Sequence, residues 1–242
     1  MSKELLLHAT PNGVSIALVQ DKQLLELHQE KNNNNYSVGD IYLGRIKKVM
    51  PGLNATFVDV GYEKDAFLHY LDLGPQVNSL VKFSKLVRNG QAMPPQLKGF
   101  KPEEDISKAG KIADVIGKVQ TLPVQIAKEP ISSKGPRLSS ELSFAGRYVV
   151  LVPFGEGVSV SKKIKSNGER NRLKRLIESI KPENFGVIIR TVSEGKGVAE
   201  LHQDLNELVA KWDSFAERLK TAEPGKKIIG EMDRTSTILR DI

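Results

Sequence analysis

The stretch from residue 53 to residue 73, LNATFVDVGYEKDAFLHYLDL, is the feature that most constrains the fold. Two short runs of alternating residues flank the turn GYEKD, a pattern typical of an antiparallel β-hairpin. If Val60 pairs with Lys64, the same register places Phe57 directly opposite Phe67. Both rings then share a face with charged or titratable residues instead of with the valines. The hairpin therefore presents two aromatic side chains on its polar side.

The sequence around this hairpin also has β character. Short apolar runs punctuated by glycine extend from Ile41 to Tyr70, and Leu122–Lys128 is a further strand candidate. Such a pattern predicts a small β-barrel. The intervening residues 74–119 are rich in proline and glycine, although SLVKFSKLV favours a helical turn or two. A loop of this length is unusual in a compact domain, so we expect an insertion with some structure of its own.

The remaining patterns predict strands at both ends of the chain and two helices. Strands are expected at Glu4–Leu7, Val14–Val19, Leu24–Leu27, Gly146–Phe154 and Phe185–Val192. Ser166 and Glu169 form an S-x-x-E capping box that begins a helix through about Ile180. A second apolar stripe, which includes Trp212, predicts a long amphipathic helix from Val198 to about Pro224, with Trp212 in the core. Taken together, the patterns indicate an α+β protein.

Composition narrows the class of protein. The chain has 242 residues, of which 39% are hydrophobic and 27% charged, and it has no cysteine. No apolar run approaches the length of about 18 residues that a membrane-spanning helix needs. The first residues, MSKELLLHATPNG, lack the apolar core of a secretory signal. We therefore expect a cytoplasmic protein without a membrane partner.

The net charge of +7 has a definite location. Residues 131–181 hold eleven lysines or arginines and four glutamates, so this stretch accounts for the whole excess. Arg170, Arg172, Lys174 and Arg175 lie off the apolar stripe of the first predicted helix. A localised basic surface suits a polyanion. The alternative interpretation is a solvated helix face whose lysines serve solubility.

Catalytic patterns are not found in this sequence. It has neither of the two glycine-rich phosphate-binding motifs, G-x-x-x-x-G-K-[ST] and G-x-G-x-x-G. It also has no nucleophile elbow and no His/Cys spacing typical of a metal site. Asp59, Glu63 and Asp65 cluster in sequence, but a turn explains them as well as a metal site would. We therefore predict no catalytic residue and no metal site in this chain.

The hairpin aromatics suggest binding. Exposed rings on a small barrel can stack nucleic-acid bases at ~1–3 kcal/mol each, while nearby cations such as Arg45, Lys47 and Lys48 contact the backbone. The alternative is that one or both rings lie under the insertion as part of the core.

Several sequence blocks resemble a known family. DIYLGRIKKVMPGLNATFVDVGYEKDAFL resembles the S-one RNA-binding module, an OB-fold barrel, of bacterial ribonuclease E/ribonuclease G endoribonucleases. KEPISSKGPRLSSELSFAGRYVVLVPF, GVSVSKKI and FGVIIRTV follow in the order of the family's segment that leads to a pocket sensing the 5′ end of RNA. The resemblance runs from the first strands to the long helix.

This resemblance implies a domain organisation. A five-stranded OB-fold barrel would be inserted into an α/β RNase H-like and 5′-sensor region. Residues 1–35 would begin the RNase H-like domain, and 36–130 would form the barrel with its insertion at about 74–119. Residues 131–222 would form the 5′ sensor, and 223–242 would begin the return to the RNase H-like domain.

The resemblance also implies roles for individual residues. Phe57 and Phe67 match the base-stacking aromatics, and Lys128 and Lys134 match basic positions near the RNA path. The residues that match the sensor pocket are Gly146, Val150, Arg190 and Thr191. A guanidinium and a hydroxyl can bind a terminal monophosphate through charge-assisted hydrogen bonds. Two positions depart from the family: Ser37 replaces a frequent lysine, and Lys162-Lys163 replaces an arginine pair.

The function implied is that of the N-terminal, RNA-engaging portion of a single-strand-specific endoribonuclease for RNA processing and decay. Its catalytic domain, with magnesium, and the parts through which it forms homo-oligomers would lie beyond residue 242, so the chain alone would be inactive. The alternative is a stand-alone RNA-binding or assembly protein without nuclease activity. An OB-fold that binds carbohydrate or protein fits the basic charge less well.

Overall fold

The computed structural model describes residues 2–11, 13–31, 35–91, 95–231 and 234–241. The strands are β1 Lys3–Thr10, β2 Gly13–Gln20, β3 Gln23–Lys31, β4 Ile41–Met50, β5 Ala55–Asp59, β6 Ala66–His69, β7 Thr121–Lys128, β8 Arg137–Ser139, β9 Phe144–Ala145, β10 Val149–Pro153, β11 Val158–Val160, β12 Phe185–Ile189 and β13 Lys227–Ile229. The α-helices are α1 Val77–Arg88, α2 Ile112–Ile116, α3 Asn167–Ile180, α4 Val198–Lys220 and α5 Arg234–Asp241. Short 3-10 helices are η1 Pro51–Leu53, η2 Tyr70–Asp72, η3 Pro95–Leu97 and η4 Thr191–Ser193.

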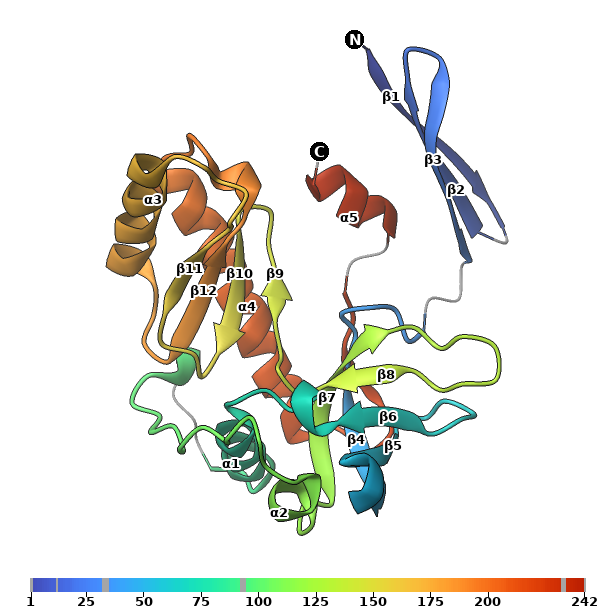
Figure 1. The fold of residues 1–242 in the computed structure, drawn as a ribbon, viewed down its shortest axis with the longest axis vertical. Coiled ribbons are helices and arrows are strands. Elements are labelled where there is room, and N and C mark those ends of the chain that lie inside the picture. The colour runs from blue at the N-terminus through green and yellow to red at the C-terminus, as the bar shows by residue number, and fades with distance from the viewer. Residues whose placement is uncertain (1, 12, 32–34, 92–94, 232–233, 242) are drawn as a thin grey trace.

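The predicted small barrel is confirmed as a closed five-stranded barrel, consistent with an OB-fold. Its strand order is β4-β5-β6-β8-β7, and pairing of β7 with β4 closes it (Figure 1). β13 adds an edge strand beside β4. The closing strand β8 comes after residue 130, where we expected the barrel segment to end. Three residues are a weak strand signal in a sequence, so β8 was not predicted.

Gly44 lies where β4 changes neighbours from β7 to β5. A Cβ at this position would lie 2.5 Å from Val58 Cγ1 and 3.0 Å from Val124 Cγ2. Both valines are fully buried inside the barrel. A glycine is needed here because the barrel interior leaves no room for a side chain.

The hairpin of β5 and β6 has the predicted register, with Phe57 opposite Phe67. The predicted pairing of Val60 with Lys64 is wrong, since β5 ends at Asp59 and β6 begins at Ala66. The Asp59 carboxylate accepts a hydrogen bond from the Gly61 N–H at 2.8 Å. Gly61 has φ +80°, and a Cβ there would lie 2.5 Å from the Gly225 carbonyl oxygen. These contacts turn the chain into a longer loop before the strands can pair further.

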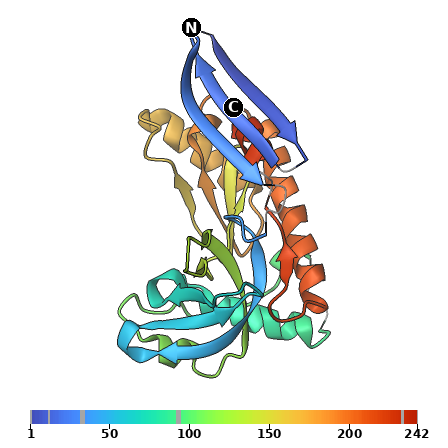
Figure 2. The same ribbon diagram turned by 90° about the vertical axis from the view of Figure 1, so that its right-hand side faces the viewer.

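A second layer is the four-stranded sheet β11-β12-β10-β9, flanked by α3 and α4 (Figure 2). The predicted strands Gly146–Phe154 and Phe185–Val192 are present but shorter, as β10 and β12. The chain after β12 instead forms η4, because the Ser193 hydroxyl donates to the Tyr148 carbonyl oxygen at 2.6 Å. Both predicted helices, α3 and the long α4, are confirmed.

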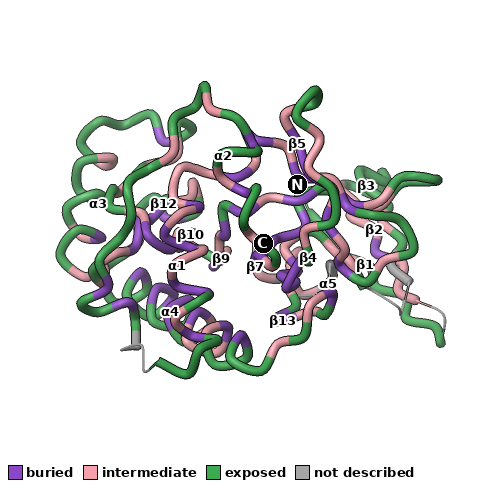
Figure 3. Tube along the Cα trace, turned by 90° about the horizontal axis from the view of Figure 1, so that it is seen from below, coloured by how far each residue is buried: buried purple, intermediate pink, exposed green. Residues whose placement is uncertain are grey.

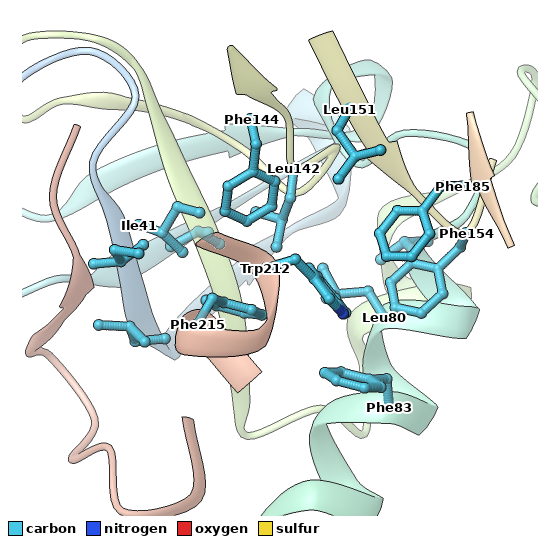
Figure 4. Packing of buried hydrophobic residues seen from close by; sticks show 14 of the residues in the cluster. Ile41, Leu80, Phe83, Leu142, Phe144, Leu151, Phe154, Phe185, Trp212 and Phe215 are labelled. Atoms are coloured by element: carbon cyan, nitrogen blue, oxygen red, sulfur yellow. The ribbon is translucent and has the colours of Figure 1, made fainter. Parts of the chain in front are cut away.

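Trp212 joins these layers in one continuous core. Its side chain is 1% exposed and contacts aromatic rings from several elements (Figure 4). These rings belong to Phe83, Phe144, Phe154, Phe185 and Phe215. Phe83 lies on α1, within the predicted insertion at 74–119. α1 therefore packs against β7 of the barrel and against α4, and buried residues run through the barrel, the sheet and these helices (Figure 3).

The predicted meander is confirmed as the three-stranded sheet β1-β2-β3. This sheet projects from the rest of the molecule (Figure 1). It carries exposed leucines, namely Leu6, Leu7, Leu24, Leu25 and Leu27. The run of asparagines at 32–35, whose composition predicts a short polar linker, falls largely on residues 32–34, which lie outside the described residues. Among the helices that the structure describes, none has the length and apolar character needed to cross a membrane.

Candidate nucleic-acid interface

The register of the barrel places five side chains side by side on its outer surface, and we call this set the platform row. It consists of Lys48, Phe57, Phe67, Arg137 and Lys128, each paired with the next across neighbouring strands. Directly paired residues point to the same face of a sheet. The neighbours of these residues along each strand, such as Val58, Leu68 and Leu138, are fully buried. The row therefore faces outward, with cations on either side of two rings.

The two phenylalanine rings contact each other edge to face. Their centroids are 5.9 Å apart with an interplanar angle of 67°. Neither ring lies in the core, so the alternative of burial under the insertion does not apply. His69 extends the set, since its ring stacks on Phe67 at 6.5 Å with an angle of 29°. The Leu71 N–H donates to His69 Nδ1 at 3.1 Å and fixes that ring.

Local irregularities decide which cations join the platform row. A bulge between Ile46 and Lys48 brings Lys48, and not Lys47, beside Phe57. A second bulge, between Ile126 and Lys128, pairs Lys128 with Arg137. Bulges re-aim side chains in this way because one strand gains a residue relative to its partner.

Arg137 was not among the predicted binding residues. Its Nε and Nη2 atoms donate to the Asp72 carboxylate at 2.9 and 3.1 Å. This two-bonded contact fixes the guanidinium on Asp72 of η2, while the backbone of Arg137 pairs with that of Phe67. Arg137 belongs to the basic stretch 131–181, which was the one signal for it in the sequence. Its place beside the rings could not be predicted because β8 was not.

The predicted residues Arg45 and Lys134 lie outside the platform row. Arg45 is exposed and pairs with Asp59, two residues along β5 from Phe57. It therefore shares the outer face of the barrel. Lys134 is exposed in the loop between β7 and β8, where its N–H donates to the Ile131 carbonyl oxygen at 3.0 Å.

The residues predicted for a sensor pocket meet at one end of the second sheet. Arg190 Nη1 donates to the carbonyl oxygens of Gly146 at 2.6 Å and of Arg147 at 3.2 Å. The Thr191 hydroxyl is 3.0 Å from that of Ser161. Val150 pairs with Ile188, two residues before Arg190, and lies on the same exposed face of the sheet. The structure thus brings Gly146, Val150, Arg190 and Thr191 together.

Asp204 of α4 contacts the backbone next to Gly146, and the sequence analysis did not identify it. Its carboxylate accepts hydrogen bonds from the N–H groups of Arg147, Tyr148 and Val149 at 2.9, 2.8 and 2.9 Å. The residue is 8% exposed. A signal did exist, because an acidic residue directly before Leu205 stands within the apolar stripe of a helix.

Some of the basic side chains on α3 are used in internal contacts. Arg170 Nη1 donates to the Ser161 carbonyl oxygen at 2.7 Å. Arg172 donates to both carboxylate oxygens of Glu169, at 2.7 and 2.6 Å, and the Gly195 N–H donates to the same carboxylate at 2.8 Å. The bonds from Arg172 and Gly195 lower the pKa of Glu169 to about 2. The predicted cap is confirmed, since the Ser166 hydroxyl accepts from the Glu169 N–H at 3.3 Å.

A cleft of about 1250 Å³ lies elsewhere, lined by residues 35–39, the end of β7 and α5. Its charged lining includes three glutamates, Glu129, Glu141 and Glu231. Against these three glutamates the described lining residues include one arginine, Arg240, so the negative charge of the cleft suits a polyanion less well than the platform row does. Within the described residues, no group of three or more acidic or histidine side chains is placed to hold a metal ion.

A family model and several curated relatives, all of one family, match this chain, and the relatives cover its whole length. A model described as "Ribonuclease E/G family" matches residues 143–242. Ribonuclease G of Haemophilus influenzae is 37% identical over 238 residues, which are 98% of this chain and 45% of that protein. Ribonuclease G of Escherichia coli K12 is 34% identical over 241 residues, 100% of this chain and 45% of that protein. Ribonuclease E of a Nostoc species is 34% identical over 209 residues, 86% of this chain and 26% of that protein.

The chain therefore spans less than half the length of these relatives. The family model covers the second sheet, α3, α4 and the residues after them, while the relatives extend the similarity across the barrel. The chain thus belongs to the ribonuclease E/G family and corresponds to an N-terminal part of its members.

Proposed function

We propose that this chain binds single-stranded RNA on the platform row and recognises a 5′-monophosphate beside Arg190 and Thr191, as the RNA-engaging part of an endoribonuclease. The observation that carries the proposal is the row itself, in which two partly exposed rings are flanked by Lys48 on one side and by Arg137 and Lys128 on the other. Bases stack on such rings whatever their sequence, while cations contact the phosphates.

The sensing part of the proposal rests on Arg190 and Thr191. A terminal monophosphate carries more negative charge and more free oxygens than an internal phosphate. A guanidinium held by the Gly146 carbonyl and a hydroxyl next to Ser161 offer donors of fixed direction for these oxygens. A 5′-hydroxyl end lacks both the charge and the acceptors, so it should bind less well.

Hydrolysis would take place in the portion of the relatives that this chain does not span, with magnesium bound there. The platform row and the sensor pocket would then hold the strand for cleavage. We accordingly expect the 242-residue chain to bind RNA in the presence of Mg²⁺ without cutting it. Appearance of shorter RNA products on a denaturing gel would contradict this division of roles.

Two matched RNAs of about ten nucleotides, a length within the range bound by an OB-fold, test the sensing proposal. They share one sequence and differ only in a 5′-monophosphate or 5′-hydroxyl end, and binding is measured by fluorescence anisotropy. We expect tighter binding of the monophosphate RNA and loss of this preference in Arg190→Gln. Arg218→Gln, which removes the same charge in the last turn of α4, is the charge-matched control. Equal binding of both RNAs by the unaltered chain would refute the sensing role.

The alternative function is RNA binding without any nuclease. The platform row supports this alternative as much as the leading proposal. Its side chains can bind RNA but include no group that could cleave it, so the row does not separate the two functions. The sequence of the gene beyond residue 242 separates the two. A continuing frame with an aspartate-containing domain favours the nuclease, and a stop codon favours the binding protein.

A further inference from the structure

Asp204 is a buried carboxylate that the proposed function does not use directly. It lies on α4 and accepts hydrogen bonds from three successive backbone N–H groups, those of Arg147, Tyr148 and Val149. Three donors on one carboxylate fix both its position and that of the donating turn. This turn connects β9 to β10 and carries Gly146 at its start.

Arg190 binds the opposite side of the same turn. Its Nη1 atom donates to the carbonyl oxygens of Gly146 and Arg147, at 2.6 and 3.2 Å. The N–H and C=O of one peptide group point in opposite directions. The two peptide groups from Gly146 to Tyr148 therefore donate to Asp204 and accept from Arg190. Their dipoles are aligned between a negative and a positive charge, which favours this one orientation of the turn.

Gly146 allows the carboxylate to approach this closely. A Cβ on Gly146 would lie 2.5 and 2.6 Å from the two carboxylate oxygens of Asp204. Such contacts are too short for nonbonded atoms, so a larger residue would displace either Asp204 or the turn. The glycine thus serves the packing of Asp204 against the backbone.

We infer that Asp204 is a positioning residue for Arg190, so that affinity for a 5′-phosphate depends on a carboxylate that does not touch the phosphate. The inference rests on the proposed function and adds a group to its pocket. It also predicts the sign of a charge effect. A carboxylate near an anion site repels the anion through space, so simple repulsion predicts that its removal strengthens binding. Positioning predicts the opposite, because the carbonyls that hold Arg190 lose their fixed orientation.

The test is Asp204→Asn in the full 242-residue chain, with the matched 5′-monophosphate and 5′-hydroxyl RNAs. Asparagine has nearly the same shape but turns an NH₂ group toward backbone N–H donors. We expect the monophosphate preference to fall about tenfold, the effect of losing roughly one charge-assisted hydrogen bond, toward that of Arg190→Gln. Binding of the 5′-hydroxyl RNA should stay almost unchanged, since the platform row is intact.

Asp40→Asn is the matched control. Asp40 is buried, accepts from the N–H groups of Ser37 and Glu231 at 3.2 and 2.9 Å, and pairs with Lys227 at 2.6 Å beside the barrel. Its substitution should lower stability without changing the ratio of the two affinities. An unchanged or increased ratio in folded Asp204→Asn would overturn the inference.

If circular dichroism finds Asp204→Asn unfolded, the unaltered chain supplies the test by NMR. The amide signals of Arg147, Tyr148 and Val149 should shift on addition of the 5′-monophosphate RNA and not of the 5′-hydroxyl RNA. The amide signals of Ser37 and Glu231 serve as the internal control. Unmoved signals in the turn, alongside a measured monophosphate preference, would overturn the inference while leaving the proposed function in place.

Discussion

Phe57 and Phe67 contact each other through one edge and one face, and each ring keeps part of its surface exposed. Exposed aromatic surface is costly unless a ligand or partner uses it. Because Lys48 and Arg137 flank the rings, we expect the ligand that contacts them to be a nucleic-acid base. The alternation of residues predicted that the rings share a face, and the assumed hairpin register placed them opposite each other, as observed.

Replacing both rings tests the platform directly. Phe57→Ala with Phe67→Ala should weaken binding of 5′-hydroxyl RNA by ~2–6 kcal/mol, the stacking free energy of two bases. Because neither ring is in the core, the variant should remain folded. Fluorescence anisotropy gives the affinity, and Leu24→Ala, which shortens an exposed leucine of β3, is the control. Unchanged affinity in a folded double variant would exclude the rings from the interface.

Gly44 offers a residue-level test of the barrel. The added methyl of Gly44→Ala would overlap Val58 and Val124, and overpacking of this kind costs about 1–3 kcal/mol of unfolding free energy. Gly52→Ala is the matched control, because nothing lies within 4 Å of a Cβ at that position. Urea denaturation measures the free energy of unfolding of both variants. Equal stability of the two variants would mean that β4 does not pack as described.

Single residues also mark where prediction from the sequence ends. Asp204 and Arg137 act through partners 55 or more residues away, namely the turn at 147–149 and Asp72. Periodicity describes only neighbours along one element, so it can place Asp204 on a stripe but cannot say what it binds. Gly146 and Arg190 were identified through family resemblance, and their mutual contact is a result of the structure.

Elements of regular period were the predictable part of the fold. The capped helix α3 and the striped helix α4 have enough turns for their apolar spacing to be distinctive. Strands β8, β9 and β13 have three residues or fewer and carry no such pattern. β8 pairs with β6 and β13 pairs with β4, both of which are distant in the sequence. These pairings decide how the barrel closes and how β13 borders β4.

The N-terminus of α3 gives a pH-dependent prediction. The pKa of Glu169 is lowered from 4.5 to about 2 by Arg172 and the Gly195 N–H. A group whose pKa is lower in the folded state stabilises the protein above its unfolded pKa, and that contribution is lost as the pH falls through the folded value. Glu169→Gln should therefore be less stable than the unaltered chain at pH 7. The difference should shrink as the pH falls from about 4.5 toward 2.

Urea denaturation at several pH values measures this difference. Glu178→Gln is the control, since Glu178 lies on the same helix in a longer, exposed pair with Lys174 at 3.7 Å. A stability difference for Glu169→Gln that stays constant between pH 7 and pH 2.5 would contradict the assignment. Loss of the Glu169 carboxylate should also loosen the loop at Gly195 and Lys196. Arg172, which the carboxylate positions, donates to the Lys196 carbonyl oxygen at 2.9 Å.

At the scale of the whole molecule, RNA binding should depend on salt through the cations of the platform row. Contacts with single strands give a slope of log affinity against log salt of about −0.7 per phosphate. Replacing Lys48 and Lys128 by glutamine should therefore reduce the slope by about 1.4. Lys3→Gln with Lys22→Gln, on the projecting sheet, is the charge-matched control. An identical slope in both double variants would place the RNA elsewhere.

The junction around Trp212 has a spectroscopic consequence. The chain has one tryptophan, and its indole contacts Phe83 of the segment 74–119 as well as Phe144, Phe154 and Phe185 from the sheet side. Its emission should be blue-shifted while these parts are docked and should move to the red when either one separates. Every variant described above can thus be checked for intact packing by its intrinsic fluorescence, with no added label.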